Sequence, residues 1–477
     1  MMITRKKMKP KVLLINPPFK YPKQIQIIPI ALLNLGTALE RNGIDVKIID
    51  ISAEKKYTHE FLPDPLKPEE FIQQVKKYDP DIIGLTSCTE NYPITMRIAR
   101  WCKEENENIK IIYGGIHATF QPLECLTDNS IIDLVVVGEA EHILPEAVSA
   151  LNGAIDLNGI SNIYYRENGL IKHSQSFTLP DLNKIPVFDI DLIKGKFYPS
   201  FLLLVEFGRG CPFNCSFCCL SPMTERKIRF FPIERIIENL SLYGERFKNF
   251  SFYISDPTFL LSLKRISQFV DEIRKRRIEL KDWNFQTRIN TLKKGILGEL
   301  RSINAAGVTI GVEDIHDSVL KVIGKEQTFE QIERGLKILK ELDYLIESNI
   351  IIGLPSQSKE HMLENIAYSD KLDICGCPCL TPFPGSQIFC HPEKFGLTFL
   401  SKDFESYTGK EIVTESDIFP FEQQREMRNL MWRHIAQVHL ERESTYFFDR
   451  KNYERILEIG FEGWNEEWKQ AHKLNWN

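Results

Sequence analysis

The chain has 477 residues, of which 43% are hydrophobic and 26% charged, a balance typical of a globular protein with a large core and two or three domains. Sixty Lys and Arg against 65 Asp and Glu give a formal net charge of −5, so no broad basic surface favours nucleic acid or an anionic membrane. The first apolar run, residues 12–15, is too short for a signal peptide or a membrane span, and we expect a cytoplasmic protein.

The first 150 residues alternate short β-rich segments with amphipathic segments. Residues 29–43 and 93–106 carry apolar side chains at helical spacing, and Gly43 stands where the first of these helices would end. Buried parallel strands read as continuous apolar runs, and five segments have that character: 11–16, 44–50, 81–87, 110–115 and 132–139. This alternation predicts a doubly wound parallel sheet, Rossmann-like or flavodoxin-like.

Four loops follow the predicted strands, at residues 16–19, 86–91, 114–119 and 138–141. No G-x-G-x-x-G sequence follows the first strand, so a dinucleotide site loses its main support. Ligands of doubly wound sheets bind at the carboxyl ends of the strands. We therefore expect ligand-binding residues from these loops, namely Asn16, Ser87, Gly114, Gly115, His117, Gly138 and Glu139.

The rest of the chain is predicted in three parts. Residues 151–200 contain turn-forming and proline-rich stretches and predict a linker with a small hairpin. Six further strands are predicted at 201–207, 249–255, 283–287, 307–313, 348–354 and 372–380, separated by helical segments. Six β/α units suit a partial (β/α)6 barrel over residues 201–390, with its site at the carboxyl ends of the strands. Residues 391–477 are aromatic and helical, and we expect a small cap packed on the barrel.

Cys211, Cys215 and Cys218 follow the first predicted barrel strand at C-x3-C-x2-C spacing. Disulfides at these separations would close rings too small to stabilise much, so a metal or cluster is the better interpretation. A structural zinc site takes four protein ligands. A four-iron four-sulfur cluster held by three cysteines instead leaves one iron free for a substrate or cofactor.

This loop, with Phe217 before the last cysteine, strongly resembles that of the radical S-adenosylmethionine (radical SAM) superfamily, whose partial six-unit barrel matches the predicted one. The resemblance implies a [4Fe-4S] cluster that binds S-adenosylmethionine and splits it to methionine and a 5'-deoxyadenosyl radical, which abstracts a substrate hydrogen. It also implies an electron donor such as flavodoxin or ferredoxin. Residues implied in binding S-adenosylmethionine follow successive strands: Asp256 at the methionyl amine, Arg288 at the carboxylate, Glu313, and Gly353 with Pro355 near adenine.

Residues 16–19 (NPPF), 114–119 (GGIHAT) and 136–141 (VVGEAE) together resemble the cobalamin (B12)-binding domain that is fused to one large radical SAM class, which makes cobalamin an expected cofactor. One departure is that this domain lacks the D-x-H-x-x-G motif whose histidine ligates cobalt in other cobalamin proteins. Asp314-Ile315-His316 has the D-x-H spacing but lies in the barrel and is interpreted as a chance match. His117 is the remaining candidate ligand, although a loop histidine more often holds backbone or a cofactor amide.

Two outcomes of the radical chemistry remain open, on a small-molecule or peptide substrate. The leading hypothesis is cobalamin-dependent methylation of an unactivated carbon. Cobalamin would carry the methyl group, and the adenosyl radical would activate the carbon that receives it. The alternative is epimerisation of L- to D-residues in a peptide, with Cys375, Cys377 or Cys379 as hydrogen-atom donor. These cysteines alternate along the sixth predicted strand and would share one face, although packing as small hydrophobic residues also explains them. A third possibility, a scaffold with a structural cluster, leaves the S-adenosylmethionine loops without a purpose.

Overall fold

The computed structural model describes residues 9–19, 26–51, 67–193, 201–247, 250–442 and 450–472. The chain divides into two compact units, and the division falls between Phe201 and Leu202. Each unit is built around its own parallel sheet.

The first unit contains a doubly wound parallel sheet, as predicted. Its parallel strands are β1 (Lys11–Asn16), β3 (Asp45–Asp50), β4 (Ile82–Thr86), β5 (Lys110–Gly114) and β6 (Leu134–Val136), in the spatial order β3-β1-β4-β5-β6. This is the flavodoxin-like order, in which the chain changes direction between β1 and β4. The residues Val12 to Ile15 are almost fully buried, as expected for a strand covered on both faces.

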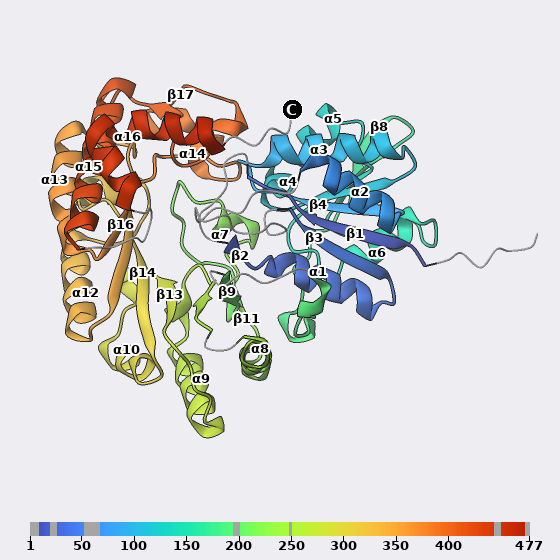
Figure 1. The fold of residues 1–477 in the computed structure, drawn as a ribbon, viewed down its shortest axis with the longest axis horizontal. Coiled ribbons are helices and arrows are strands. Elements are labelled where there is room, and N and C mark those ends of the chain that lie inside the picture. Colours follow the sequence, from blue (N-terminus) through green and yellow to red (C-terminus); the bar gives the residue numbers. More distant parts are fainter. Residues whose placement is uncertain are drawn as a thin grey trace, which may run out of the picture. The chain divides into compact units, whose positions relative to one another are not determined.

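Helices cover both faces of this sheet. Figure 1 shows α1 and α6 on one face and α2 and α3 on the other. The helices of the unit are α1 (Ile30–Arg41), α2 (Pro68–Tyr78), α3 (Tyr92–Glu105), α4 (Ile116–Phe120), α5 (Pro122–Asp128) and α6 (Leu144–Leu151), and a short strand, β2 (Gln26–Ile27), precedes α1. Gly43 has φ +70° just after α1, in the left-handed conformation that ends helices readily.

The predicted hairpin forms, but it belongs to the first sheet. It consists of β7 (Ile163–Glu167) and β8 (Leu170–His173), and β7 pairs antiparallel with β6. The interpretation of residues 151–200 as a linker did not foresee this pairing. The physical reason is that β6 would otherwise present unpaired backbone groups at a sheet edge. Residues 194–200 of that segment lie outside the described residues.

The second unit contains the predicted six parallel strands, in simple sequential order. They are β9 (Phe201–Val205), β12 (Phe252–Ile254), β13 (Trp283–Thr287), β14 (Ala305–Glu313), β15 (Leu345–Ile350) and β16 (Ile374–Gly376). The prediction was wrong in detail for the last two, because β15 begins three residues earlier and β16 is only three residues long. The six strands form a partial barrel, and the loops at their carboxyl ends lie on one rim of it.

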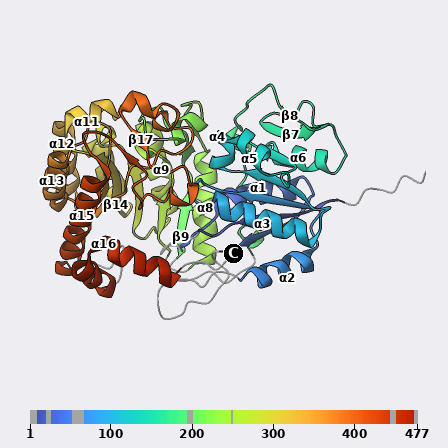
Figure 2. The same ribbon diagram turned by 90° about the horizontal axis from the view of Figure 1, so that it is seen from above.

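The helices of the second unit lie outside these strands. Figure 2 shows α11, α12 and α13 on the outer side of β14. The helices that alternate with the barrel strands are α8 (Ile233–Arg246), α9 (Leu263–Arg276), α10 (Lys294–Arg301), α11 (Asp317–Val322), α12 (Phe329–Glu341) and α13 (Lys359–Tyr368). α12 starts at a capping box in which Thr328 and Gln331 satisfy each other's backbone N–H groups.

The C-terminal region is helical, as predicted. Its two long helices are α15 (Phe421–Glu441), which packs on α13, and α16 (Arg450–His472). α15 and α16 join through aromatic contacts, with the rings of Trp432 and Phe461 stacked at 4.7 Å between centroids. Short elements precede them: α14 (Gln387–Cys390), β17 (Thr398–Phe399) and β18 (Thr414–Glu415).

Candidate functional site

The three-cysteine loop lies at the carboxyl end of the first barrel strand. Just before it, β10 (Gly208–Arg209) pairs antiparallel with β11 (Arg229–Phe230), so a short ladder closes the loop at its base. Cys211, Cys215 and Cys218 are free, partly exposed thiols. Burial raises the pKa of the Cys218 thiol, an effect that a bound metal would offset by stabilising the thiolate.

Backbone contacts hold this loop in place. Gly210 has φ +98°, and a Cβ atom there would collide with the carbonyl oxygen of Lys227, so the turn requires glycine. At the middle of the loop, the N–H of Ser216 donates to the carbonyl of Ile323 at 2.9 Å. The carbonyl of Ser216 accepts from the N–H of Ile388 at 3.0 Å. The loop is therefore tied to two segments that are distant in sequence.

Arg288 lies beside this loop, one residue after β13. Its Nη1 donates to Sγ of Cys215 at 3.0 Å, and its guanidinium carbon lies 3.9 Å from the ring centre of Phe213. The side chain is buried, yet within the described structure its Nε and Nη2 atoms have no hydrogen-bond partner. A buried guanidinium with two unused N–H groups is a ready partner for a carboxylate, which it binds through paired hydrogen bonds.

Asp256 makes contacts different from those expected of an amine ligand. Its carboxylate is buried, and Oδ1 accepts a hydrogen bond from the backbone N–H of Phe207 at 2.7 Å. Burial raises the pKa of Asp256 to about 8, although backbone N–H groups of Phe207 and Gly208 act in the opposite direction. These bonds anchor the turn that leads into the cysteine loop. Thr258, two residues further on, faces the loop with Oγ1 3.6 Å from Sγ of Cys211.

Glu313 ends β14 and forms a buried ion pair. Its Oε1 lies 2.7 Å from Nζ of Lys325, and both side chains are at most one-tenth exposed. The Lys325 ammonium also lies 5.9 Å from the ring centre of Phe217 in the cysteine loop. Lys325 was not among the site residues predicted from the sequence, since nothing near it resembles a motif. Its pairing with Glu313 depends on the close return of the chain after α11.

Gly353 and Pro355 form a buried turn after β15. Gly353 has φ +86°, and a Cβ atom there would lie 2.5 Å from Oε1 of Gln424 in α15. Only glycine fits both the backbone conformation and the close neighbour. The turn therefore packs closely against α15 at the carboxyl end of the strand.

The three cysteines at residues 375–379 are buried, but they do not lie along one strand. That expectation was wrong, because β16 ends at Gly376 and contains only Cys375. Burial raises the pKa of Cys375 to about 12 and that of Cys379 to about 11, and it raises the pKa of Cys377 well above its usual value. The Cys379 thiol faces the carbonyl of Lys410 at 3.6 Å, in the C-terminal region. These thiols are therefore neutral and packed.

The loops of the first unit meet at the carboxyl edge of its sheet. Asn16 ends β1 and its Nδ2 donates to Oδ1 of Asp50 at 3.2 Å. Ser87 follows β4 and its hydroxyl is hydrogen-bonded to that of Tyr113. Because the topology reverses between β1 and β4, this edge is where a flavodoxin-like sheet binds its ligand.

Glycines at the same edge leave room for close backbone approach. Gly115 follows Gly114, has φ +97°, and a Cβ atom there would lie 2.6 Å from the carbonyl oxygen of Ser87. Gly138 has φ +73°, and its N–H donates to Oγ1 of Thr119 at 2.9 Å. Glu139, next in the chain, is buried. The loops after β5 and β6 are thus held by each other's polar groups.

His117 lies inside the first unit rather than on a loop surface. It is fully buried in α4, its ring stacks on that of Tyr92 at 4.1 Å, and its Nδ1 lies 3.3 Å from Oγ1 of Thr89. Burial lowers the pKa of His117 to about 4, so the ring is neutral at physiological pH. These contacts are those of a packed histidine that orders the loops, and they do not favour it as a cobalt ligand.

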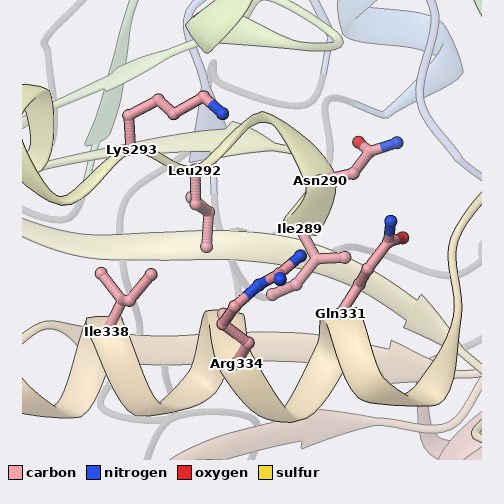
Figure 3. A pocket seen from close by; sticks show the side chains of 8 residues that line it. Ile289, Asn290, Leu292, Lys293, Gln331, Arg334 and Ile338 are labelled. Carbon is pink, nitrogen blue, oxygen red and sulfur yellow. The ribbon is translucent and has the colours of Figure 1, made fainter.

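A separate pocket of about 260 Å³ lies on the outer side of the barrel. Figure 3 shows Gln331, Arg334 and Ile338 rising from α12 toward the segment that carries Ile289, Asn290, Leu292 and Lys293. The floor is apolar and the rim carries two cations. Neither Lys293 nor Arg334 forms an ion pair with a described residue. Such a rim can receive an anionic group.

Two absences hold for the residues that the structure describes. Among the described residues, no group of three or more His, Cys, Asp or Glu side chains is arranged to bind a single metal ion. A four-iron cluster is several ångströms across, so its three cysteine ligands approach different corners rather than one point. None of the described helices combines the length and the apolar character needed to cross a bilayer.

Family comparisons agree with this two-part architecture. Residues 25–148 match the model of the B12 binding domain, and residues 205–368 match that of the radical SAM superfamily. An uncharacterized methyltransferase of Pyrococcus horikoshii is 30% identical over 401 residues, which cover 83% of this chain and 84% of that protein. The chain belongs to the radical SAM enzymes that carry a B12-binding domain.

Other similar proteins are named for different reactions. The anaerobic magnesium-protoporphyrin IX monomethyl ester cyclase of Rubrivivax gelatinosus is 25% identical over 356 residues, covering 72% of this chain and 63% of that protein. Among solved structures, the radical S-adenosylmethionine methyltransferase TsrM of Kitasatospora setae, with cobalamin and a [4Fe-4S] cluster bound, superimposes with a TM-score of 0.69. That match has 16% identity and covers 90% of this chain and 89% of TsrM. The fold of the radical SAM enzyme is thereby shown over most of its length.

The cofactors of this B12-binding radical SAM enzyme are a [4Fe-4S] cluster, S-adenosylmethionine and cobalamin, and its residues fit them. Three free cysteines share one anchored loop, and the unused N–H groups of Arg288 lie beside it. At the carboxyl edge of the first sheet, the backbone at Gly115 approaches Ser87 too closely for any side chain. That close approach packs the loop after β5 against the loop after β4, at the edge where a flavodoxin-like sheet binds its ligand.

Proposed function

We propose that the enzyme methylates an unactivated carbon of a small-molecule or peptide substrate, with cobalamin as methyl carrier. Its similarity to a protein named as a methyltransferase supports this reaction class. The observation that carries the proposal is the buried Arg288 guanidinium, which touches Cys215 and keeps two N–H groups unused. A guanidinium at this position would bind the carboxylate of S-adenosylmethionine beside the cysteines that would hold the cluster.

Each part of the chain has a distinct task in this proposal. Cys211, Cys215 and Cys218 hold the cluster, and Arg288 orients the S-adenosylmethionine carboxylate. The turn at Gly353 and Pro355, which α15 holds closely, would contact the adenine. Together the bound cofactors supply a carbon radical and a transferable methyl group.

In the first unit, the proposed role of the loops is to hold cobalamin. The residues proposed to contact it are Asn16, Ser87, Gly114, Gly115, Gly138 and Glu139, all at the carboxyl edge of the parallel sheet. His117 supports these loops from below through its stack on Tyr92.

A labelled methyl group tests methyl transfer without knowledge of the substrate. Anaerobic enzyme loaded with cluster and cobalamin is incubated with a reductant and S-adenosylmethionine that carries a deuterated methyl group. We expect the label on the recovered cobalamin and 5'-deoxyadenosine in the solution. Formation of 5'-deoxyadenosine with no label on cobalamin would contradict methylation and favour a reaction such as the ring closure of the cyclase relative.

The epimerase alternative remains a prediction with its own test. Cys375, Cys377 and Cys379 are neutral thiols, the form that can donate a hydrogen atom. An epimerase adds one deuterium per converted residue in heavy water, whereas a methylase adds the mass of a methyl group. Full product formation by the three single alanine variants would leave these cysteines as packing residues.

An acidic electron-transfer protein such as flavodoxin or ferredoxin is the proposed source of electrons. Each reductive cleavage of S-adenosylmethionine consumes one electron, which must reach the cluster from outside. The pocket rim with Lys293 and Arg334 has the complementary charge, and its segment begins one residue after Arg288, which touches the cysteine loop. We propose this rim as the docking surface of that donor.

A further inference from the structure

A buried polar network connects the carboxyl ends of β14 and β15. At its centre is Asp314, which is fully buried and directly follows the ion-paired Glu313. Its Oδ1 accepts from the backbone N–H of His316 and lies 2.7 Å from Nδ1 of the same residue. Its Oδ2 accepts from Nε2 of Gln357 at 2.7 Å and from Nδ2 of Asn365 at 2.8 Å. A buried carboxylate with this many donors is fully satisfied.

Gln357 transmits the position of Asp314 to the backbone of the turn after β15. Its Oε1 accepts from the N–H groups of Gly353 at 2.7 Å and Leu354 at 3.3 Å. Its Nε2 donates to Asp314 and also to the carbonyl of Ile351 at 3.0 Å. Both donors and both acceptor positions of the amide are therefore used. The orientation of the amide is fixed, because its nitrogen must face a carboxylate and its oxygen must face two N–H groups.

Asn365 bonds to the same carboxylate oxygen but leads elsewhere. It lies on α13, and its Oδ1 accepts from the backbone N–H of Ile315 at 3.0 Å. Asn365 thus fixes the helix to the end of β14 and does not contact the turn at Gly353. The two amides make the same kind of bond to Asp314, and only one of them reaches the turn.

We propose that Gln357, oriented by Asp314, is a positioning residue that sets the affinity of the enzyme for S-adenosylmethionine. The inference rests on the proposed function, in which the turn at Gly353 and Pro355 contacts the adenine. Oε1 of Gln357 binds the N–H groups of both Gly353 and Leu354, so it fixes the backbone conformation of this turn. A residue that never touches S-adenosylmethionine then determines the shape of its site.

The test uses two variants that place the same new charge beside Asp314. Gln357→Glu replaces the donor at 2.7 Å with a second buried carboxylate, whose repulsion from Asp314 displaces the side chain and with it the oxygen that holds the Gly353 and Leu354 N–H groups. Asn365→Asp likewise replaces the donor at 2.8 Å with a carboxylate, without touching the turn. We expect both variants to lose a similar amount of thermal stability. Only Gln357→Glu should weaken equilibrium binding of S-adenosylmethionine to the cluster-loaded enzyme, by about tenfold or more.

Hydrogen exchange gives a readout that needs neither cofactor nor turnover. In the cluster-free protein, the amides of Gly353 and Leu354 should exchange faster in Gln357→Glu than in the wild type and remain protected in Asn365→Asp. If Gln357→Glu does not fold, Gln357→Asn replaces it, because the shorter amide reaches Asp314 or the turn but not both. The double variant Asp314→Asn with Gln357→Glu restores a donor opposite the carboxylate and should recover part of the protection.

The two proposals fail in different ways. A wild-type enzyme that holds its cluster yet does not bind S-adenosylmethionine overturns the proposed function and leaves the exchange result meaningful. Equal losses of binding in Gln357→Glu and Asn365→Asp, or unchanged exchange at Gly353 and Leu354, overturn the positioning role.

Discussion

The guanidinium of Arg288 donates a hydrogen bond to the sulfur of Cys215 at 3.0 Å, although the two residues are 73 positions apart in sequence. This contact joins the end of β13 to the cysteine loop. It places a permanent positive charge next to a proposed cluster ligand, within a buried environment where charge is costly unless it is balanced. In the proposed function, the cluster thiolates and the carboxylate of S-adenosylmethionine would supply the balancing charge.

Replacement of Arg288 with lysine should separate cofactor binding from cluster assembly. Lysine keeps the charge but cannot form paired hydrogen bonds with a carboxylate. We expect equilibrium binding of S-adenosylmethionine to weaken by about 10- to 100-fold, corresponding to the loss of one charged hydrogen bond, while iron content stays near normal. Arg301→Lys, at a partly exposed arginine paired with Asp343, is the matched control. Equal effects of the two substitutions would remove the proposed role.

Each of Cys211, Cys215 and Cys218 should be required for the cluster. Single alanine variants should lose bound iron, the visible absorption of the cluster and the production of 5'-deoxyadenosine. Cys390→Ala provides the control, since Cys390 is an exposed free thiol in the same unit. Retention of 5'-deoxyadenosine production by any of the three variants contradicts the assignment.

Gly115 should be required for cobalamin binding because its backbone lies close to Ser87, and not only because of its own backbone conformation. Gly115→Ala places a methyl group 2.6 Å from the Ser87 carbonyl oxygen, whereas Gly159, with a similar φ of +99°, has nothing within 4 Å of its Cβ position. Both substitutions cost roughly 1–3 kcal/mol of backbone strain. We expect Gly115→Ala to lose cobalamin binding, measured by equilibrium dialysis, and Gly159→Ala to retain it.

Because the ion pair of Lys325 and Glu313 is buried, removing one of its two charges should lower the free energy of unfolding more than removing both. Lys325→Met leaves the Glu313 carboxylate buried without its partner and should destabilise the protein by roughly 3–5 kcal/mol. The double variant with Glu313→Gln removes both charges and should recover most of the loss. Thermal unfolding of the four proteins measures this coupling; additive effects would mean that the two groups do not interact.

The proposed docking surface predicts a difference between reductants. Lys293→Glu combined with Arg334→Glu should slow S-adenosylmethionine cleavage at least about tenfold when flavodoxin supplies electrons, because the charge complementarity is reversed. Cleavage driven by dithionite should be unchanged. Lys264→Glu, at an exposed lysine on α9, should change neither rate. A loss with dithionite as well would indicate damage to the site instead of to docking.

The apolar runs predicted the two parallel sheets, which the structure contains, because the alternation of strands and helices is a local pattern. The cysteine spacing is equally local, and the assignment of Cys211, Cys215 and Cys218 as cluster ligands stays a prediction. The roles of Asp256 and His117 could not be read in the same way. Which hydrogen bonds Asp256 forms depends on where β9 ends relative to β12, and whether His117 is exposed depends on how Tyr92 packs. The network around Asp314 was missed for the same reason, since Gln357 and Asn365 reach it from a different strand and helix.

The N–H of Ser216 donates to the carbonyl of Ile323, its carbonyl accepts from the N–H of Ile388, and neither bond involves a cysteine side chain. The entropy of ordering the cysteine loop is then lost when the chain folds and not when the cluster is assembled. We therefore expect the cluster to be inserted into a loop that is already ordered. An enzyme whose cluster has been destroyed by oxygen should accordingly be repairable in its folded form, by iron and sulfide alone.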